Sequence, residues 1–183
     1  SRGLGDVYKR QEYIDGKSLR QYVNDETGAG GNLSVHEICR IGVELCCILE
    51  YLHGFNGNGI LHMDIKPDNI MLDINGKVKL IDFDNAVAGN AGVSVDSGSP
   101  LYAAPEQYSG EYAVTQSDVY SVGMVILFMV SHGHIKTDKG HNLAGIPRRY
   151  SRLYHVIEKS IHHQWGLRYS SVTVSYTHLT LPT

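Results

Sequence analysis

The chain has 183 residues, of which 42% are hydrophobic and 19% are charged, a composition typical of a soluble globular domain with a buried core. Its formal net charge of -3 gives no electrostatic basis for binding nucleic acid or an acidic membrane surface. The longest apolar stretch, residues 122–130, is too short to span a membrane. Cys39, Cys46 and Cys47 have neither a metal-site spacing nor a disulfide framework, which favours a reducing cytoplasm.

The first part of the chain combines extended and helical patterns. Residues 12–16 are expected to end a strand and to run into a connecting segment, and residues 18–23 are expected to form a short helix. The following residues 24–32 are polar and rich in Gly, which predicts a loop.

A long helix is predicted from Ser34, a favourable N-cap, to about His53. Glu37 stands three residues after Ser34, which is the spacing of a capping box. Apolar residues recur along this segment at helical spacing and give it one apolar face: Ile38, Ile41, Leu45, Ile48, Leu49 and Leu52.

A β-hairpin is predicted over residues 70–81, because two apolar runs flank a turn that contains Asn75-Gly76. Three further elements complete the prediction: a short strand at 59–61, a buried helix without a polar face at about 118–130, and an amphipathic helix at 153–161.

Three motifs follow one another in the second quarter of the chain and just beyond it. Residues 62–69 read H-M-D-I-K-P-D-N, residues 82–84 read D-F-D, and residues 98–106 read G-S-P-L-Y-A-A-P-E. Together they resemble the catalytic loop, the metal-binding motif and the peptide-docking segment of eukaryotic-type Ser/Thr protein kinases, bacterial members included. The resemblance implies an α+β, protein-kinase-like fold: a mainly helical C-lobe with a short β-hairpin, and no N-lobe in this chain.

Four residues carry the chemistry that the resemblance implies, with ATP and Mg²⁺ as cofactors and protein substrates as partners. Asp64 is the expected catalytic base for a substrate hydroxyl, and Lys66 is expected to neutralise charge on the transferring phosphoryl group. Asn69 and Asp82 are expected to hold Mg²⁺, which prefers amide and carboxylate oxygens. Lys66 and the following Pro67 favour Ser/Thr over Tyr specificity.

The resemblance also implies a nucleotide site beside the hairpin. Backbone groups of Glu12 and Ile14 are expected to bond the adenine edge, and Met71 is expected to form the floor beneath the ring. Ser18 is assigned to the same cofactor site. A plain core position is the alternative for Met71.

Scaffold roles are implied for six further residues. His62 is expected to pack beside Phe83, and Asp118 is expected to accept backbone N–H groups of the catalytic loop. Ser99 is expected to bond Asp64 and Lys66. A buried ion pair is expected between Glu106 and Arg168, because an unpaired buried carboxylate is costly.

Two positions depart from the family pattern. Met63 stands where the family commonly has an Arg that pairs with a phosphorylated residue, so activation by phosphorylation of the loop is not expected. Asp84 replaces a Gly whose backbone freedom other residues lack, which keeps a pseudokinase that serves as a binding scaffold open as an alternative.

A second alternative is a small-molecule kinase of the aminoglycoside or choline type, because residues 80–84, L-I-D-F-D, fit that pattern too. Lys66 and the segment 98–107 favour a protein kinase instead.

The two ends of the chain are identified as foreign sequence. Residues 1–11 and 174–183 can both be back-translated into transposase sequencing adapters read in frame. The kinase-like part is then residues 12–173, an internal piece of a longer reading frame, and both tails are expected to pack poorly. The pattern gives no oligomeric state.

Overall fold

The computed structural model describes residues 12–89, 98–109, 111–135, 143 and 146–180. Its α-helices are α1 (Leu19–Gly28), α2 (Val35–His53), α3 (Thr115–Val130), α4 (Ser151–Ser160) and α5 (Val172–Thr180). Its strands are β1 (Gly16–Ser18), β2 (Ile60–Leu61), β3 (Ile70–Asp73), β4 (Val78–Leu80) and β5 (Val87–Ala88). Short 3₁₀ helices are η1 (Phe55–Gly57), η2 (Pro105–Tyr108), η4 (Arg148–Tyr150) and η5 (Trp165–Leu167).

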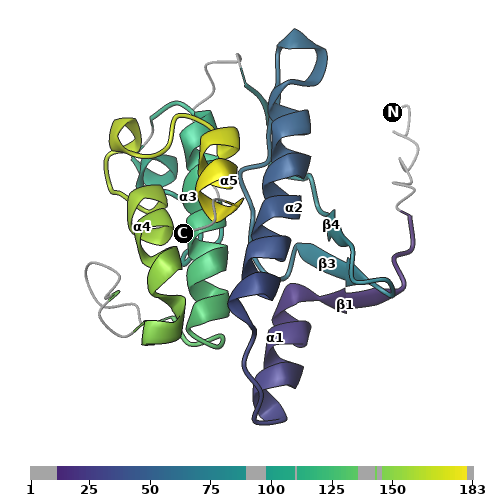
Figure 1. Cartoon of the computed structure of the whole chain (residues 1–183). Helices are drawn as coiled ribbons and strands as arrows, with labels where there is room; N and C mark the ends of the chain where they lie inside the picture. The colour runs from purple at the N-terminus through teal and green to yellow at the C-terminus, as the bar shows by residue number, and fades with distance from the viewer. Residues whose placement is uncertain (1–11, 90–97, 110, 136–142, 144–145, 181–183) are drawn as a thin grey trace.

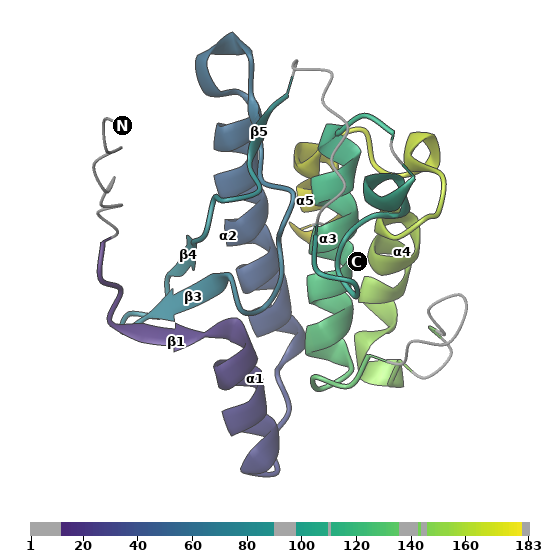
Figure 2. The ribbon, with the colours of Figure 1, turned by 180° about the vertical axis from the view of Figure 1, so that it is seen from behind.

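Helix α2 is the central element of the arrangement. Helices α3, α4 and α5 gather on one side of it, while α1 and the strands β1, β3 and β4 lie on the other (Figure 1). The view from behind shows the same division (Figure 2). The expected α+β class, mainly helical with a hairpin, is therefore confirmed, and the described residues contain no N-lobe.

The predicted hairpin is present as β3 and β4, which pair antiparallel with Ile70 opposite Leu80. Gly76 takes a φ of 74° in the turn, a conformation that favours Gly. Strand β1 adds to the other edge of β3, with Ser18 opposite Met71. The strand end expected within residues 12–16, before a connecting segment, is wrong, because residues 12–15 are in no strand and β1 begins at Gly16.

The loop expected over residues 24–32 is wrong for its first part, because residues 24–28 belong to helix α1. The helix continues to Gly28, because a capping box between Ser18 and Gln21 starts it and the fully buried Leu19 and Val23 hold it against the core. Tertiary packing of the first turns thus outweighs the polar composition of the last one.

Helix α2 begins and ends as predicted, with Ser34 as its N-cap. The Ser34 hydroxyl accepts the Glu37 backbone N–H at 3.1 Å. The Glu37 carboxylate accepts a hydrogen bond from the Tyr22 hydroxyl of α1, so the side chain ties two helices together.

The predicted core helix is α3, whose residues from Ser117 to Val130 are all buried. It lies among α2, α4 and α5, which explains why the sequence gives it no polar face. The predicted amphipathic helix is α4. Within the described ranges, no helix is long and apolar enough to cross a membrane.

The expectation that residues 174–183 pack poorly is wrong for the part that the structure describes. Residues 172–180 form α5, which packs along α2 with Leu179 buried against Gly42. Gly42 leaves room on α2 for an apolar side chain, and Leu179 fills it. Packing does not reveal the origin of these residues, so the adapter origin remains a prediction. Residues 1–11 lie outside the described residues.

Candidate active site

The segment between β2 and β3 gathers polar side chains around the buried carboxylate of Asp64. Oδ2 of Asp64 accepts hydrogen bonds from Nζ of Lys66 at 2.7 Å and from Nδ2 of Asn69 at 3.1 Å. Oδ1 of Asp64 accepts from the Ser99 hydroxyl at 3.0 Å. Nζ of Lys66 also donates to the Ser99 oxygen at 2.9 Å, so these residues close a ring of hydrogen bonds. The contacts predicted for Ser99 are present.

Asn69 is oriented by two hydrogen bonds from its amide nitrogen. Nδ2 donates to the backbone oxygen of Asp64 at 2.9 Å in addition to the carboxylate. The amide oxygen of Asn69 has no donor among the described residues, so this hard oxygen is available to a cation.

Asp82 lies just beyond β4, beside the same segment. The Ile81 N–H donates to the Asn69 backbone oxygen at 2.9 Å, which holds the start of the D-F-D motif against Asn69. The carboxylate of Asp82 is exposed and accepts the Asp84 N–H at 3.4 Å. An exposed carboxylate and a free amide oxygen form a donor set that fits Mg²⁺ with phosphate oxygens as its other ligands. The described residues contain no cluster of three His, Cys, Asp or Glu side chains that could hold a metal ion alone.

His62 is buried and connects the two motifs. Its Nδ1 accepts the Asp64 N–H at 3.3 Å, and its Nε2 faces the Ile81 carbonyl oxygen at 3.2 Å. Burial lowers the pKa of His62, against opposing effects led by the charge of Asp118. A neutral ring with the proton on Nε2 satisfies both contacts. The predicted packing on Phe83 is present, with ring centroids 4.8 Å apart.

Asp118, fully buried on α3, holds the backbone that leads into Asp64. Its carboxylate oxygens accept the N–H groups of His62 and Met63, each at 2.9 Å, as predicted. Met63 has a φ of 64°, which is unusual for a residue with a long side chain. His53 of α2 adds a 2.8 Å contact from Nε2 to the same carboxylate. The sequence analysis missed His53, because a His at the end of a helix first indicates a favourable charge at that end.

The predicted contact between Glu106 and Arg168 is a buried, two-pronged ion pair. The guanidinium donates to the two carboxylate oxygens at 2.7 and 2.8 Å, and the Ser117 hydroxyl adds a third bond at 2.8 Å. Burial by itself raises the pKa of Glu106, but the hydrogen bonds and the charge of Arg168 outweigh it, so the pKa lies below its usual value. This pair ties the end of the 98–106 segment to the loop before α5.

A hollow of about 300 Å³ lies where the nucleotide site was expected. It is lined by Glu12, Tyr13, Ile14, Met71 and Ile81, so three of the four residues assigned to this site come together. Ser18 does not line it, because its hydroxyl accepts the Gln21 N–H at 3.2 Å and caps α1.

Arg20 on α1 is a second residue that the sequence analysis missed. Its guanidinium binds the Asp68 carboxylate through two hydrogen bonds, at 2.7 and 2.8 Å, and lies 5.1 Å from the centre of the Phe128 ring. The hydrogen bonds between the two side chains raise the pKa of Arg20 and lower the pKa of Asp68. Nothing in the local sequence links positions 20 and 68, which only the fold brings together.

The two departures from the kinase pattern differ in their structural consequences. The Met63 side chain is buried in a small apolar cluster with Leu61. This apolar setting suits a Met side chain and not the charged Arg that the family commonly has at this position. Asp84 does not take a positive φ; the left-handed residue of the motif is Asp82, at 63°. The backbone cost expected from replacing Gly at position 84 is therefore not found.

Comparisons with known proteins agree with this geometry. The family model described as protein kinase domain matches residues 5–170. The chain is 38% identical over 123 residues to MAP kinase kinase MKK1/SSP32 of Saccharomyces cerevisiae, covering 66% of this chain and 23% of the relative. It is 34% identical over 147 residues to the probable serine/threonine-protein kinase PknB of Lactococcus lactis, covering 74% and 22%.

A third relative is the serine/threonine-protein kinase PrkC of Bacillus subtilis, 33% identical over 135 residues, with 72% of this chain and 20% of the relative covered. The chain thus spans about a quarter or less of the length of these curated relatives.

Proposed function

The chain belongs to the protein kinase domain family, and from this premise we propose that it supplies the catalytic lobe of an ATP-dependent Ser/Thr protein kinase. The observation that carries the proposal is the ring of hydrogen bonds that joins Asp64, Lys66 and Ser99. It places a carboxylate that can accept the alcohol proton beside a cation that can offset the phosphoryl charge, and the Ser99 hydroxyl contacts both.

In the proposed mechanism Asp64 orients the hydroxyl of a substrate Ser or Thr and accepts its proton as the new P–O bond forms and the bond from the γ-phosphorus to the departing ADP oxygen breaks. Lys66 moves its ammonium group from Asp64 towards the phosphoryl oxygens, whose negative charge it offsets. The Ser99 hydroxyl keeps Asp64 in place during this exchange.

ATP is the proposed phosphoryl donor, with adenine in the hollow beside Met71 and Mg²⁺ held by Asn69 and Asp82. When bound, Mg²⁺ offsets the charge of the phosphates and fixes their position. The free amide oxygen of Asn69 supports this assignment.

A protein substrate is favoured over a small molecule by the segment around Ser99. Its end is fixed by the buried pair of Glu106 and Arg168, so it offers a firm surface beside Asp64 on which a peptide can lie. A small-molecule kinase has no need of such a segment.

We also propose that residues 12–173 are inactive or nearly so by themselves. The described residues supply one wall of the nucleotide hollow, and Tyr13 on that wall is largely exposed. The adapter origin of residues 1–11 and 174–183 belongs to the same proposal.

The test compares wild type with Asp64→Asn in a protein that carries the complete kinase domain. Transfer of labelled phosphate from ATP–Mg²⁺ to a Ser/Thr-containing protein should fall by about 10² or more, since the amide cannot accept the hydroxyl proton. Asp15→Asn, an exposed carboxylate outside the site, should leave transfer unchanged. If the protein binds ATP–Mg²⁺ yet shows no transfer that Asp64→Asn reduces, the pseudokinase alternative replaces this proposal.

A further inference from the structure

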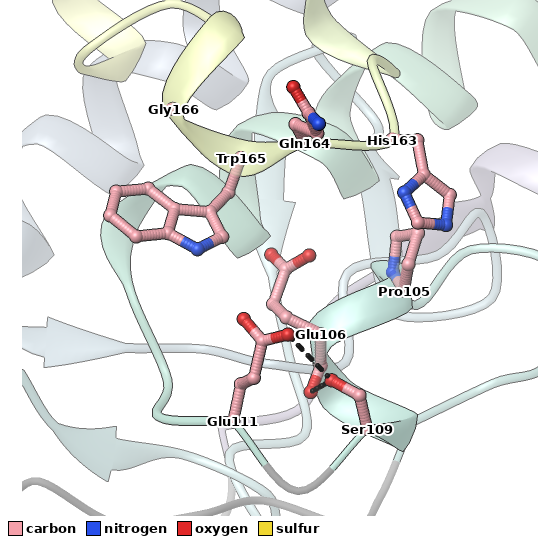
Figure 3. Close-up of a pocket in the computed structure, with 8 residues that line it drawn as sticks. All are labelled: Pro105, Glu106, Ser109, Glu111, His163, Gln164, Trp165 and Gly166. Atoms are coloured by element: carbon pink, nitrogen blue, oxygen red, sulfur yellow. Dashed lines mark hydrogen bonds between the residues drawn. The ribbon is translucent and has the colours of Figure 1, made fainter.

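A second hollow, with a volume of about 520 Å³, lies away from the motifs of the candidate active site. Figure 3 shows its lining, four residues from the segment 105–111 and four from the loop 163–166. No residue of 62–69 or 82–84 contributes to it. We call it the Trp165 pocket.

Arg168 holds the two sides of this pocket together, and all of its hydrogen-bond donors are occupied within the protein. Besides the two bonds to Glu106, its guanidinium donates to the backbone oxygens of His162 at 2.7 Å, Gln116 at 2.9 Å and His163 at 3.1 Å. All five N–H donors therefore have partners inside the protein. These bonds hold the loop 163–166 against η2. The charges of Arg168 and Glu106 are paired with each other and are not available to a ligand.

The charge that remains in the pocket is the carboxylate of Glu111. Its side chain is exposed, and Oε1 accepts a hydrogen bond from the Ser109 hydroxyl at 3.1 Å. Over the described part of the chain, no Lys, Arg or His side chain pairs with it. The pocket thus presents one negative charge with open acceptor positions.

Trp165 supplies an aromatic face next to this charge. Its side chain is 43% exposed, and no described residue stacks on the ring or accepts its N–H. In Figure 3 the indole and the Glu111 carboxylate border the same side of the hollow, with His163 at the far end. An aromatic ring beside a carboxylate is a setting that attracts a cation, and Trp is the strongest ring for this purpose.

We propose that the Trp165 pocket binds an arginine side chain of a protein partner. A planar guanidinium can stack on the indole while it donates two parallel hydrogen bonds to Glu111, a combination that an ammonium group cannot make. The volume exceeds one guanidinium, which leaves room for neighbouring peptide atoms. An anionic partner such as a phosphopeptide is disfavoured, because every donor of Arg168 is occupied. This inference goes beyond the proposed phosphotransfer and does not depend on it.

The single Trp of the chain makes the pocket directly observable. The experiment titrates the whole chain with acetyl-Gly-Gly-Arg-Gly-Gly-amide and follows Trp fluorescence, using the citrulline peptide as a neutral analogue of the same shape. The arginine peptide should give a saturable change. The citrulline peptide should bind at least about tenfold more weakly, since both the ion pair and the cation–π contact are lost.

Glu111→Gln should weaken the arginine peptide about tenfold and remove the preference over citrulline. Glu158→Gln, which removes an exposed carboxylate of α4 outside the pocket, should change neither. Trp165→Ala, followed by calorimetry and checked for folding by circular dichroism, should also weaken binding. The proposal is overturned by equal binding of the two peptides, by unchanged affinity in Glu111→Gln or Trp165→Ala, or by a phosphoserine peptide binding more tightly than the arginine peptide.

Discussion

Two ion pairs in this molecule have the same hydrogen-bond distances and differ in their surroundings. Arg168–Glu106 and Arg20–Asp68 each join a guanidinium to two carboxylate oxygens at 2.7 and 2.8 Å. The side chains of the first pair are 0% and 3% exposed, whereas those of the second are 36% and 46% exposed. Because water competes for exposed charges, burial and not bond geometry should decide how much each pair contributes.

Each pair holds one of the segments that carry the sequence motifs. The buried pair joins the end of the 98–106 segment to the loop before α5, at the base of the Trp165 pocket. The exposed pair joins α1 to the segment 62–69, where the Arg20 backbone N–H also donates to the Pro67 backbone oxygen at 3.2 Å. We therefore expect the buried pair to maintain the fold and the exposed pair to adjust the position of the proposed active site.

The largest effect is expected on breaking the buried pair. Arg168→Met should lower the free energy of unfolding by about 3–5 kcal/mol, because Glu106 is then a buried charge without a partner. Urea unfolding measures the loss, and Arg152→Met, at an exposed position of α4, is the control with little effect. A loss below about 1 kcal/mol for Arg168→Met would show that burial does not distinguish the two pairs.

The pH dependence of the same pair sharpens the comparison. The pKa of Glu106 is lowered in the folded protein, so its stabilisation is complete above the ordinary Glu pKa of about 4.3 and is lost as the pH falls through the lower folded value. The difference in unfolding free energy between wild type and Glu106→Gln should therefore shrink as the pH falls from about 5 to about 3. Acid titrations monitored by circular dichroism test this, and a difference that grows towards low pH would contradict it.

The exposed pair should matter little for stability and more for catalysis. Arg20→Met should cost about 0.2–1 kcal/mol of unfolding free energy, the usual range for an exposed pair. In the complete kinase domain it should slow phosphotransfer several-fold, because the guanidinium no longer holds Asp68 in register with Asp64, while the backbone bond from residue 20 to Pro67 remains. Lys17→Met, which breaks the exposed 2.6 Å pair between Lys17 of β1 and Asp25 of α1, should leave the rate unchanged. Equal rates for wild type and Arg20→Met would remove the positioning role.

The smallest effect is expected outside both pairs. Ser94→Ala and Ser97→Ala should leave phosphotransfer of the complete kinase domain within a few-fold of wild type, because the buried Met63 offers no charge to a phosphorylated loop residue. Both serines lie outside the described residues. Loss of phosphotransfer in Ser94→Ala or Ser97→Ala would show that another cation pairs with the phosphorylated loop residue, a role that Met63 cannot perform.

Local sequence predicted the parts of this molecule whose cause is local. The N-cap Ser34 and the apolar periodicity that follows it predicted α2, and Asn75-Gly76 predicted the hairpin turn. The uniformly apolar segment after Ser117 indicated a buried helix. The motif resemblance also predicted the contacts of Asp64, Ser99 and Asp118, because their spacing is characteristic of one family. The catalytic roles themselves remain predictions.

Other features came only from tertiary structure, because they depend on residues that are distant in the sequence. Packing of Leu19 and Val23 extended α1 into a polar stretch, and the space beside Gly42 received Leu179 of a segment expected to stay loose. Arg20 meets Asp68 across 48 positions, and His53 meets Asp118 across 65. A periodic pattern or a cap acts over a few residues, whereas a buried ion or an open pocket is decided by which surfaces the fold brings together.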